Sequence, residues 1–219
     1  METVVITGAS EGIGRETALT FLCSYPGFRV IGIDQAPATI EHPNYTHFEQ
    51  YIGGNTPLPP VPEVHYLINN AGTQDELDSI DVNLEGLIRC TEMYGLQPHI
   101  KAIVNVASTS AHNGAEFPRY AASKGGVLAY TKWTAQAIAP YGATCNSVSP
   151  GGVCTDMNAH ILNQPELYKQ VLDETLLGKW ASASEVADWI YFIAVTNKSM
   201  TGQDIIIDNG ELSKFNFVW

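Results

Sequence analysis

The sequence predicts an α/β fold with a doubly wound, Rossmann-like parallel sheet in a single domain spanning residues 1–219. Three observations lead to this prediction. A short apolar β-branched run, Val4–Ile6, leads directly into a glycine-spaced turn, as in a strand that is covered on both faces. Strand and helix patterns then alternate along the whole chain. The 219 residues, 45% hydrophobic and 16% charged, suit one globular domain.

The turn after the first strand is the strongest local signal. Gly8, Gly12 and Gly14 remove side chains from the bend, and a helix is expected over Ile13–Ser24. The backbone can then approach a pyrophosphate, which the free N–H groups and the positive dipole end of the helix stabilise. Glycine turns between a strand and a helix also occur for geometric reasons alone, so the turn needs support from its context.

That context is the second strand, Arg29–Ile33, which ends in Asp34 twenty residues after Gly14. A carboxylate there can accept hydrogen bonds from the two adenosine ribose hydroxyls and repels a 2′-phosphate. Gln35 follows it and Glu11 lies in the turn, so no Arg or Lys is in sequence position to pair with that phosphate. We therefore expect NAD rather than NADP, although a solvated acid at a strand end is the simpler alternative.

The next connection is unusual. After an expected strand at Tyr45–Ile52, the segment Gly53–Pro62 holds four prolines in ten residues, which excludes a regular helix. The following strand is expected at Val64–Asn69. An extended loop must replace the crossover helix, and ten residues reach about 33 Å, enough to pass several strands about 4.8 Å apart.

The rest of the chain continues the alternation of helices and strands. A helix is expected over Asp75–Tyr94, with Leu77, Ile80, Leu84, Leu87, Ile88 and Thr91 near one face. The later elements are a strand at Lys101–Ala107, a polar loop at Ser108–Pro118, a helix at Arg119–Ala139 ended by Pro140, a strand at Thr144–Val148, an irregular stretch at Ser149–Asp156, helices at Pro165–Leu176 and Ser184–Val195, and a strand at Asp204–Ile207.

Composition excludes several classes of function. Twenty-three acidic against eleven basic residues give a formal charge of −12, which argues against nucleic-acid or anionic-membrane partners. The first strand leaves no room for a secretory signal, and no apolar run reaches the length of a membrane span. Four cysteines without C-x-x-C spacing fit reduced thiols in a cytoplasmic protein, and the scattered histidines predict no metal site.

Three residues have the spacing needed for acid–base chemistry. Tyr120 and Lys124 are four apart on one expected helix, so their side chains share a face. A phenol has a reference pKa of about 10, and a nearby ammonium favours its ionised form. Ser108 follows a buried strand, where ligands of open α/β sheets bind. Taken singly, a Tyr/Lys pair is commonly a surface pair, and a serine is commonly a turn former.

Together these motifs resemble the short-chain dehydrogenases/reductases over nearly the whole chain. The resemblance rests on Thr7–Gly14, Asp34, Asn69–Gly72, Asn83, Ser108, Tyr120–Lys124, Pro150–Gly151 with Thr155, and Thr201-Gly-Gln. It implies that Tyr120 is the general acid/base, that Ser108 orients the substrate oxygen, that Lys124 activates the phenol and binds the nicotinamide ribose, and that Asn83 holds a relay water. The implied NAD-binding residues are Gly8, Ser10, Glu11, Gly12, Ile13, Gly14, Asp34, Asn70, Ala71, Gly72, Tyr120, Lys124, Pro150, Gly151, Val153 and Thr155.

The resemblance also implies a function: an NAD(H)-dependent oxidoreductase that interconverts a secondary alcohol and a ketone, working as a homo-dimer or tetramer. A non-catalytic NAD-binding sensor or scaffold is the alternative, although it would need no activated phenol. A sugar-nucleotide epimerase or dehydratase is disfavoured because it would need a larger substrate domain. The substrate pocket is expected from Thr109–Phe117 with His112 and Asn113, from Met157–Leu162 with His160, and from the tail residues Phe215, Phe217 and Trp219, which subunit packing explains better.

Two departures from the family pattern affect the adenine side. The proline-rich Gly53–Pro62 stands where the family has a helix, and only ten residues separate Gly72 from Asn83. Adenine contacts are therefore less certain than the active site, with Glu49 as a candidate.

Overall fold

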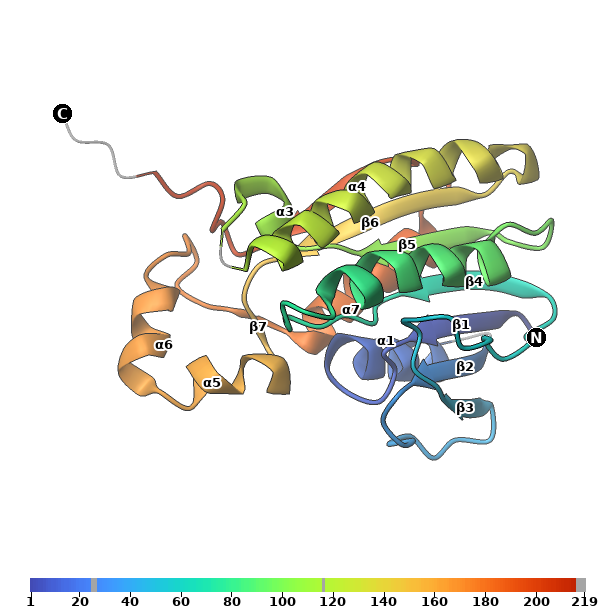
Figure 1. The fold of residues 1–219 in the computed structure, drawn as a ribbon, viewed down its shortest axis with the longest axis horizontal. Coiled ribbons are helices and arrows are strands. Elements are labelled where there is room, and N and C mark those ends of the chain that lie inside the picture. Colours follow the sequence, from blue (N-terminus) through green and yellow to red (C-terminus); the bar gives the residue numbers. More distant parts are fainter. Residues whose placement is uncertain (25–26, 116, 216–219) are drawn as a thin grey trace.

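A computed structural model describes residues 1–24, 27–115 and 117–215. Its main sheet has seven parallel strands in the order β3-β2-β1-β4-β5-β6-β9, which confirms the predicted doubly wound, Rossmann-like fold (Figure 1). The strands are β1 (Thr3–Thr7), β2 (Arg29–Asp34), β3 (Tyr45–Glu49), β4 (Val64–Asn69), β5 (Ala102–Val106), β6 (Thr144–Pro150) and β9 (Asp204–Ile207). A second, two-stranded sheet pairs β7 (Val153–Cys154) with β8 (Ala181–Ser182).

Helices connect the strands. The α-helices are α1 (Gly12–Cys23), α2 (Leu87–Cys90), α3 (Ser110–Asn113), α4 (Pro118–Ile138), α5 (Ala159–Leu162), α6 (Pro165–Leu172) and α7 (Ala183–Tyr191). Three π-helical turns adjoin them: η1 (Asp81–Gly86) and η2 (Thr91–Gly95) flank α2, and η5 (Phe192–Thr196) extends α7. In Figure 1, α3, α5 and α6 gather at the end of the sheet where the strands end.

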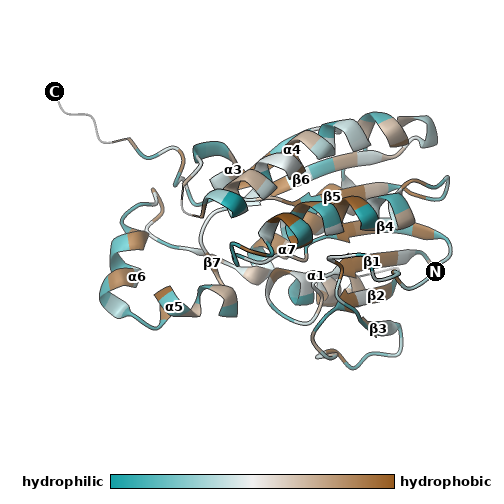
Figure 2. Ribbon diagram, viewed as in Figure 1, coloured by the Kyte–Doolittle hydropathy of each residue, from teal (hydrophilic) through white to brown (hydrophobic). Residues whose placement is uncertain are grey.

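Hydrophobic side chains alternate between the two faces of the sheet. Val4 and Ile6 pack with α1 and α7, whereas Val5 packs with η2 and α4 on the opposite face. Figure 2 shows the resulting concentration of hydrophobic residues on the central strands. Both faces are thus covered, as a parallel sheet requires.

The strand order reverses between β1 and β4. The two strands are parallel neighbours, with Thr7 beside Asn69 at their carboxyl ends. In open α/β sheets such a reversal leaves a crevice outside the carboxyl ends, and ligands bind there. The chain therefore places the glycine turn after β1 and the Asn69–Gly72 motif after β4 at one edge.

The proline-rich connection has no regular structure, as predicted. Residues 53–62, all of them described, form neither helix nor strand on their way from β3 to β4. The guanidinium of Arg89 holds the start of this connection by donating to the carbonyl oxygens of Ile52 (2.7 Å), Gly53 (3.2 Å), Thr56 (2.5 Å) and Gly54. The carboxylate of Asp81 accepts from the Gly54 N–H at 2.9 Å. Side chains of the helical segment 81–95 therefore hold the loop where a helix would otherwise pack.

The predicted helix over Asp75–Tyr94 is wrong at its start and only partly right in its buried face, because Leu87 and Thr91 are buried as predicted whereas Ile80, Leu84 and Ile88 are half-buried. Asp75 accepts a hydrogen bond from the Leu77 N–H at 2.8 Å, so the chain forms a turn there and Leu77 is 82% exposed. The π turns have more residues per turn than an α-helix, which rotates the buried stripe. The fully or nearly fully buried side chains of the segment are Ser79, Val82, Asn83, Leu87, Cys90, Thr91 and Tyr94.

The other predicted helix and strand ends differ from the observed ends by about one turn or less. The predicted polar loop after β5 contains the single turn α3, which Gly114 ends in the left-handed conformation with φ 67°. The predicted helix to Leu176 ends at Leu172, because the Thr175 N–H and hydroxyl both turn back to the Leu172 carbonyl. The β3 strand ends at Glu49 instead of continuing to Ile52.

Three further findings concern composition. The described part of the chain contains no helix long and apolar enough to cross a membrane. All four cysteines are free thiols, as predicted. Within the described residues, no group of three or more His, Cys, Asp or Glu side chains is arranged to hold a metal ion.

Candidate active site

A cavity of about 1070 Å³ lies at the carboxyl ends of the sheet strands. The segments after β1, β2, β4, β5 and β6 all contribute to its wall, together with α4, α6 and the chain after β9. Its volume is at the upper end of the range for ligand sites, large enough for a dinucleotide with a small second ligand.

The glycine turn forms one wall of this cavity in a conformation that requires glycine. Gly8 has φ 67°, and a Cβ on it would lie 2.8 Å from the Cα of Ala71. A Cβ on Gly14 would overlap the Gly8 carbonyl oxygen, which explains the close approach of α1 to β1. The N-cap residue Glu11 makes no side-chain cap, so the first N–H groups of α1 keep their capacity for an anion.

Asp34 lines the cavity at the end of β2 and is held firmly. Its Oδ2 accepts from the Ser10 N–H at 2.9 Å, and its Oδ1 accepts from the Ala36 N–H at 3.0 Å. Each oxygen keeps a lone pair for a further donor. Among the described residues that line the cavity, the basic side chains of Lys and Arg type are Lys124 and Lys214 alone, and Asp34 bonds to neither.

The side of the cavity beyond Asp34 is lined by Gln50, Tyr51, Ile52 and Val82. Glu49, the candidate for adenine contact, is not among the lining residues, and its side chain is exposed at the end of the edge strand β3. The Tyr51 hydroxyl donates to Asp81 at 3.4 Å. The same carboxylate that holds the proline-rich connection therefore holds this wall.

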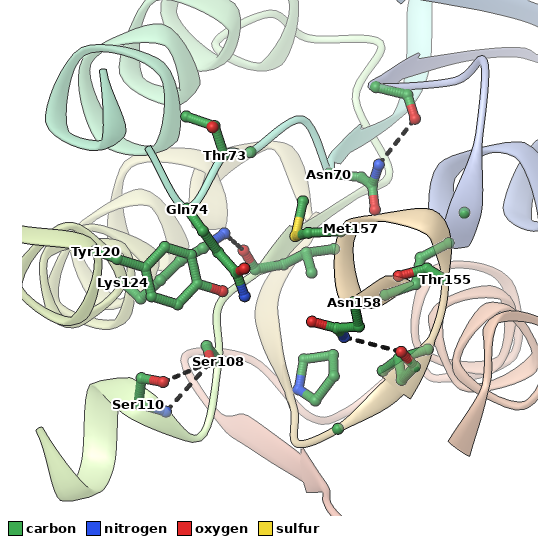
Figure 3. Close-up of a pocket in the computed structure, with 18 of the residues that line it drawn as sticks. Asn70, Thr73, Gln74, Ser108, Ser110, Tyr120, Lys124, Thr155, Met157 and Asn158 are labelled. Carbon is green, nitrogen blue, oxygen red and sulfur yellow. Dashed lines mark hydrogen bonds between the residues drawn. The ribbon is translucent and has the colours of Figure 1, made fainter. Parts of the chain in front are cut away.

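Ser108, Tyr120 and Lys124 all line one region of the cavity and are all buried (Figure 3). Lys124 Nζ lies 5.8 Å from the centroid of the Tyr120 ring and donates to the Val106 carbonyl oxygen at 2.7 Å. Burial lowers the pKa of Lys124 to about 8. The Lys124 side chain is still mostly protonated at pH 7. Its positive charge therefore lies close to the phenol ring of Tyr120, one turn away on the same helix.

The hydroxyl of Ser108 has a fixed position. It accepts from the Ser110 N–H at 3.2 Å and donates to Ser110 Oγ at 3.3 Å, at the start of α3 (Figure 3). Ser110 also lines the cavity. A substrate oxygen beside Tyr120 would therefore meet a hydroxyl that is already oriented by its neighbour.

Three of the expected site residues lie behind the cavity wall. Ser10 is buried and donates through its hydroxyl to the Ala36 carbonyl oxygen at 3.2 Å, and Gly14 packs against Gly8. Asn83 lies in the π turn η1, where its Nδ2 donates to the Ser123 hydroxyl at 3.1 Å and to the Thr73 carbonyl at 2.9 Å. π turns are frequent at functional sites, and this one brings Asn83 under Gly72.

The remaining expected cofactor residues line the cavity: Gly8, Glu11, Gly12, Ile13, Asp34, Asn70, Ala71, Gly72, Pro150, Gly151, Val153 and Thr155. Asn70 Nδ2 donates to the carbonyl oxygens of Thr7 and Gly8 at 3.1 and 3.0 Å, which ties the two motif loops together. Asn158 Nδ2 donates to the Val153 carbonyl at 2.9 Å and fixes the loop after β6 (Figure 3).

The expected substrate-pocket residues divide into two groups. Those that line the cavity are Thr109, Ser110, Asn113, Ala115, Phe117, Met157, Asn158, His160 and Ile161. The prediction that His112 lines the pocket is wrong. Its Nε2 lies 2.8 Å from a carboxylate oxygen of Asp204, and the residue does not line the cavity. Phe215 is 70% exposed and is not a lining residue, whereas Phe217 and Trp219 lie outside the described residues.

Sequence reasoning missed several lining residues: Gln74, Tyr51, Trp180, Glu211 and Lys214. Gln74 lies two residues after the Asn69–Gly72 motif, and its place in the segment after β4 is the signal that could have identified it. Glu211 and Lys214 follow β9, whose carboxyl end also reaches the cavity edge. Trp180 packs against Gly152 through the small β7–β8 sheet, and no sequence pattern indicates that pairing.

The chain is similar to known reductases and dehydrogenases. A family model described as enoyl-(acyl carrier protein) reductase matches residues 61–211. The 3-oxoacyl-[acyl-carrier-protein] reductase of Synechocystis sp. is 28% identical, with 95% of this chain and 96% of that protein covered. Galactitol 2-dehydrogenase (L-tagatose-forming) of Cereibacter sphaeroides is 30% identical, with 94% and 92% covered.

Solved structures of the same fold contain either form of the dinucleotide. 4-Hydroxyisoleucine dehydrogenase, solved with NADH, has a TM-score of 0.85 at 22% identity, with 98% of this chain and 100% of that chain covered. ElxO, solved with NADP, has a TM-score of 0.82 at 23% identity, with 97% and 99% covered. The fold alone therefore does not choose between the two cofactors.

Proposed function

This chain belongs to the short-chain dehydrogenase/reductase family of oxidoreductases, and we propose that it uses NAD(H) to interconvert a secondary alcohol and the corresponding ketone. The observation that carries the proposal is the buried cluster of Ser108, Tyr120 and Lys124 on one cavity that also contains Asp34 and the glycine turn. A binding protein that only senses a dinucleotide would have no use for a phenol beside a buried ammonium.

The proposed mechanism assigns one task to each side chain. Tyr120 takes the proton from the alcohol hydroxyl in oxidation and returns it to the carbonyl oxygen in reduction. Lys124 stabilises the negative charge on the phenol oxygen. Ser108, whose single hydroxyl proton is donated to Ser110 Oγ in this structure, would turn that proton to the substrate oxygen, where charge develops. Asn83 holds the helix and the Thr73 loop beneath this cluster. Bound NAD would accept or supply the hydride.

The choice of NAD rests on Asp34. The carboxylate lies where the ribose hydroxyls of a dinucleotide on the glycine turn would come, and its second lone pairs can accept from them. A 2′-phosphate would meet that negative charge, with Glu11 also on the wall, and neither Lys124 nor Lys214, the Lys and Arg side chains among the described lining residues, bonds to Asp34. The expected cytoplasmic location and homo-oligomeric assembly belong to the same proposal.

A screen of secondary alcohols with NAD⁺ and of ketones with NADH, followed at the nicotinamide absorbance, tests the proposal. Tyr120→Phe should retain cofactor binding and lose turnover by a factor of about 10² to 10⁴. Tyr141→Phe is the matched control, because that tyrosine is exposed beyond the far end of α4. Unchanged turnover in Tyr120→Phe would refute the catalytic assignment, and a preference for NADPH would refute the argument from Asp34.

A further inference from the structure

The part of the cavity beyond the Ser108–Tyr120 cluster, here called the substrate half, is rich in carboxylates. It is formed by α3, by the loop and helices after β7, and by the chain after β9 (Figure 1). Its lining residues include Asn113, Phe117, His160, Asp173, Glu174, Trp180, Glu211 and Lys214. Three of these carry carboxylates and one carries an ammonium, so the region has an excess of negative charge.

The single lysine of the substrate half already has partners. Lys214 Nζ donates to the main-chain carbonyl oxygens of Asp173 and of Thr175, the latter at 3.3 Å. These bonds join the chain after β9 to the end of α6. These bonds use two of the three N–H donors of the ammonium, and its single charge offsets only one of the three carboxylates.

The contacts of Glu211 place its carboxylate beside the segments that follow β5 and β6. Its Oε1 accepts from the hydroxyl of Thr109, the residue after Ser108, at 3.4 Å. A Cβ on Gly151 would lie 2.6 Å from its Oε2. The carboxylate is thus placed over Gly151, between the catalytic strand end and the loop after β6.

Building on the proposed function, we propose that the substrate is a small polar alcohol or ketone without a carboxylate or phosphate, whose hydroxyl or amino groups donate hydrogen bonds to Glu211. A donor group on the substrate would add a charge-assisted hydrogen bond to this carboxylate, which already accepts from Thr109. A carboxylate at the same position would face like charge in a partly enclosed site.

The same charges distinguish two kinds of ligand. A substrate that carries a phosphate or a carboxylate brings negative charge to a chain with a formal charge of −12 and to a substrate half with excess carboxylates. A neutral polyol brings hydroxyl groups, which donate and accept hydrogen bonds without adding charge. The chemistry of the substrate half thus favours the second kind of ligand.

Three alcohols with one four-carbon skeleton test the charge preference: butane-1,3-diol, 4-aminobutan-2-ol and 3-hydroxybutanoate. Each is titrated into the NADH-loaded protein by calorimetry, where no reaction follows because alcohol and cofactor are both reduced. The diol and the amino alcohol should bind at least about tenfold more tightly than the carboxylate, the difference expected for one bond to a charged group.

The variant Glu211→Gln assigns this preference to one residue. It should weaken binding of the amino alcohol about tenfold and narrow the gap between the diol and the carboxylate, with the affinity for NADH unchanged. Glu166→Gln is the matched control, because this exposed carboxylate of α6 is not a lining residue. Equal effects of both variants would overturn the role of Glu211.

Binding of 3-hydroxybutanoate as tightly as the diol would overturn the inference, and so would no binding by any of the three. Turnover of the same compounds with NAD⁺ is a separate measurement. A charge preference in binding without any turnover would refute the proposed function and leave the inference on ligand charge standing.

Discussion

Lys124 carries a buried ammonium, and the variant Lys124→Met measures what that burial costs. Because burial lowers the pKa of Lys124 from 10.5 to about 8, the unfolded chain binds more protons than the folded chain between these two pH values. The free energy of unfolding should therefore rise with pH across this window in the wild type. A methionine of similar length does not titrate, so the variant should lack that rise.

The expected size follows from the shift. The pKa of Lys124 differs by about 2.5 between the unfolded and the folded protein, and each pKa unit corresponds to about 1.4 kcal/mol. The buried lysine therefore lowers the free energy of unfolding by roughly 3 kcal/mol at pH 7, and about 2 kcal/mol of this is regained by pH 9.5. The variant also loses the hydrogen bond from Nζ to the Val106 carbonyl, at a cost of about 1–3 kcal/mol. The amine keeps an N–H donor for this bond at both pH values, so the part of the cost that is common to them cancels in the comparison.

The assay is guanidinium unfolding of the cofactor-free protein at pH 7 and pH 9.5. Relative to Lys124→Met, the wild type should gain about 2 kcal/mol between these values, or roughly 4–8 °C in Tm. Lys132→Met, on an exposed position of the same helix, is the matched control and should show no such gain. Parallel pH profiles for the wild type and Lys124→Met would refute the assignment of a buried, depressed lysine.

Three further predictions concern the cofactor side. Gly14→Ala should lower the free energy of unfolding by about 1–3 kcal/mol and weaken NAD binding, because its Cβ would overlap the Gly8 carbonyl. Gly125→Ala is the control and should be tolerated, because the space around Gly125 is open. Thermal unfolding and an NAD titration measure the two effects. Arg89→Ala should raise the KM for NAD about tenfold with kcat retained in steady-state kinetics, because the loop beside the cavity loses its charged donor. Asp34→Ala should shift the ratio of kcat/KM for NADP over NAD upward about tenfold, since a negative charge facing the 2′-phosphate is removed.

Each of these has a contrary outcome. Normal NAD binding by Gly14→Ala would mean that α1 can move away from β1 without loss. An unchanged KM for NAD in Arg89→Ala would show that the prolines of residues 53–62 hold the conformation of the loop without the arginine. An unchanged cofactor ratio in Asp34→Ala would remove the argument for NAD.

Much of the fold could be predicted because its signals are local. The apolar run at Val4–Ile6 and the strand at Asp204–Ile207 show strand character without reference to the rest of the chain. The four prolines of Gly53–Pro62 exclude a helix wherever they occur. The start of the helix before Asn83 was missed because it depends on one side-chain bond from Leu77 N–H to Asp75, which competes with the helical pattern.

The candidate site was predictable where one motif provides the residues and less so where distant segments meet. The helix spacing of Tyr120 and Lys124 places both side chains on one face, and the structure has them together in the cavity. Glu211 and Trp180 reach the cavity only through the packing of β9 and of the small β7–β8 sheet. His112 lies in the expected segment, but its direction is set by Asp204, 92 residues further along the chain.

The proline-rich connection has a consequence for the entropy of nucleotide binding. Each of its four prolines has little backbone freedom even in the unfolded chain, so ordering this segment on folding costs less entropy than ordering ten ordinary residues would. Arg89 and Asp81 fix it further in the folded protein without any ligand. The wall beside the dinucleotide site is therefore preorganised, and binding energy need not be spent on ordering it.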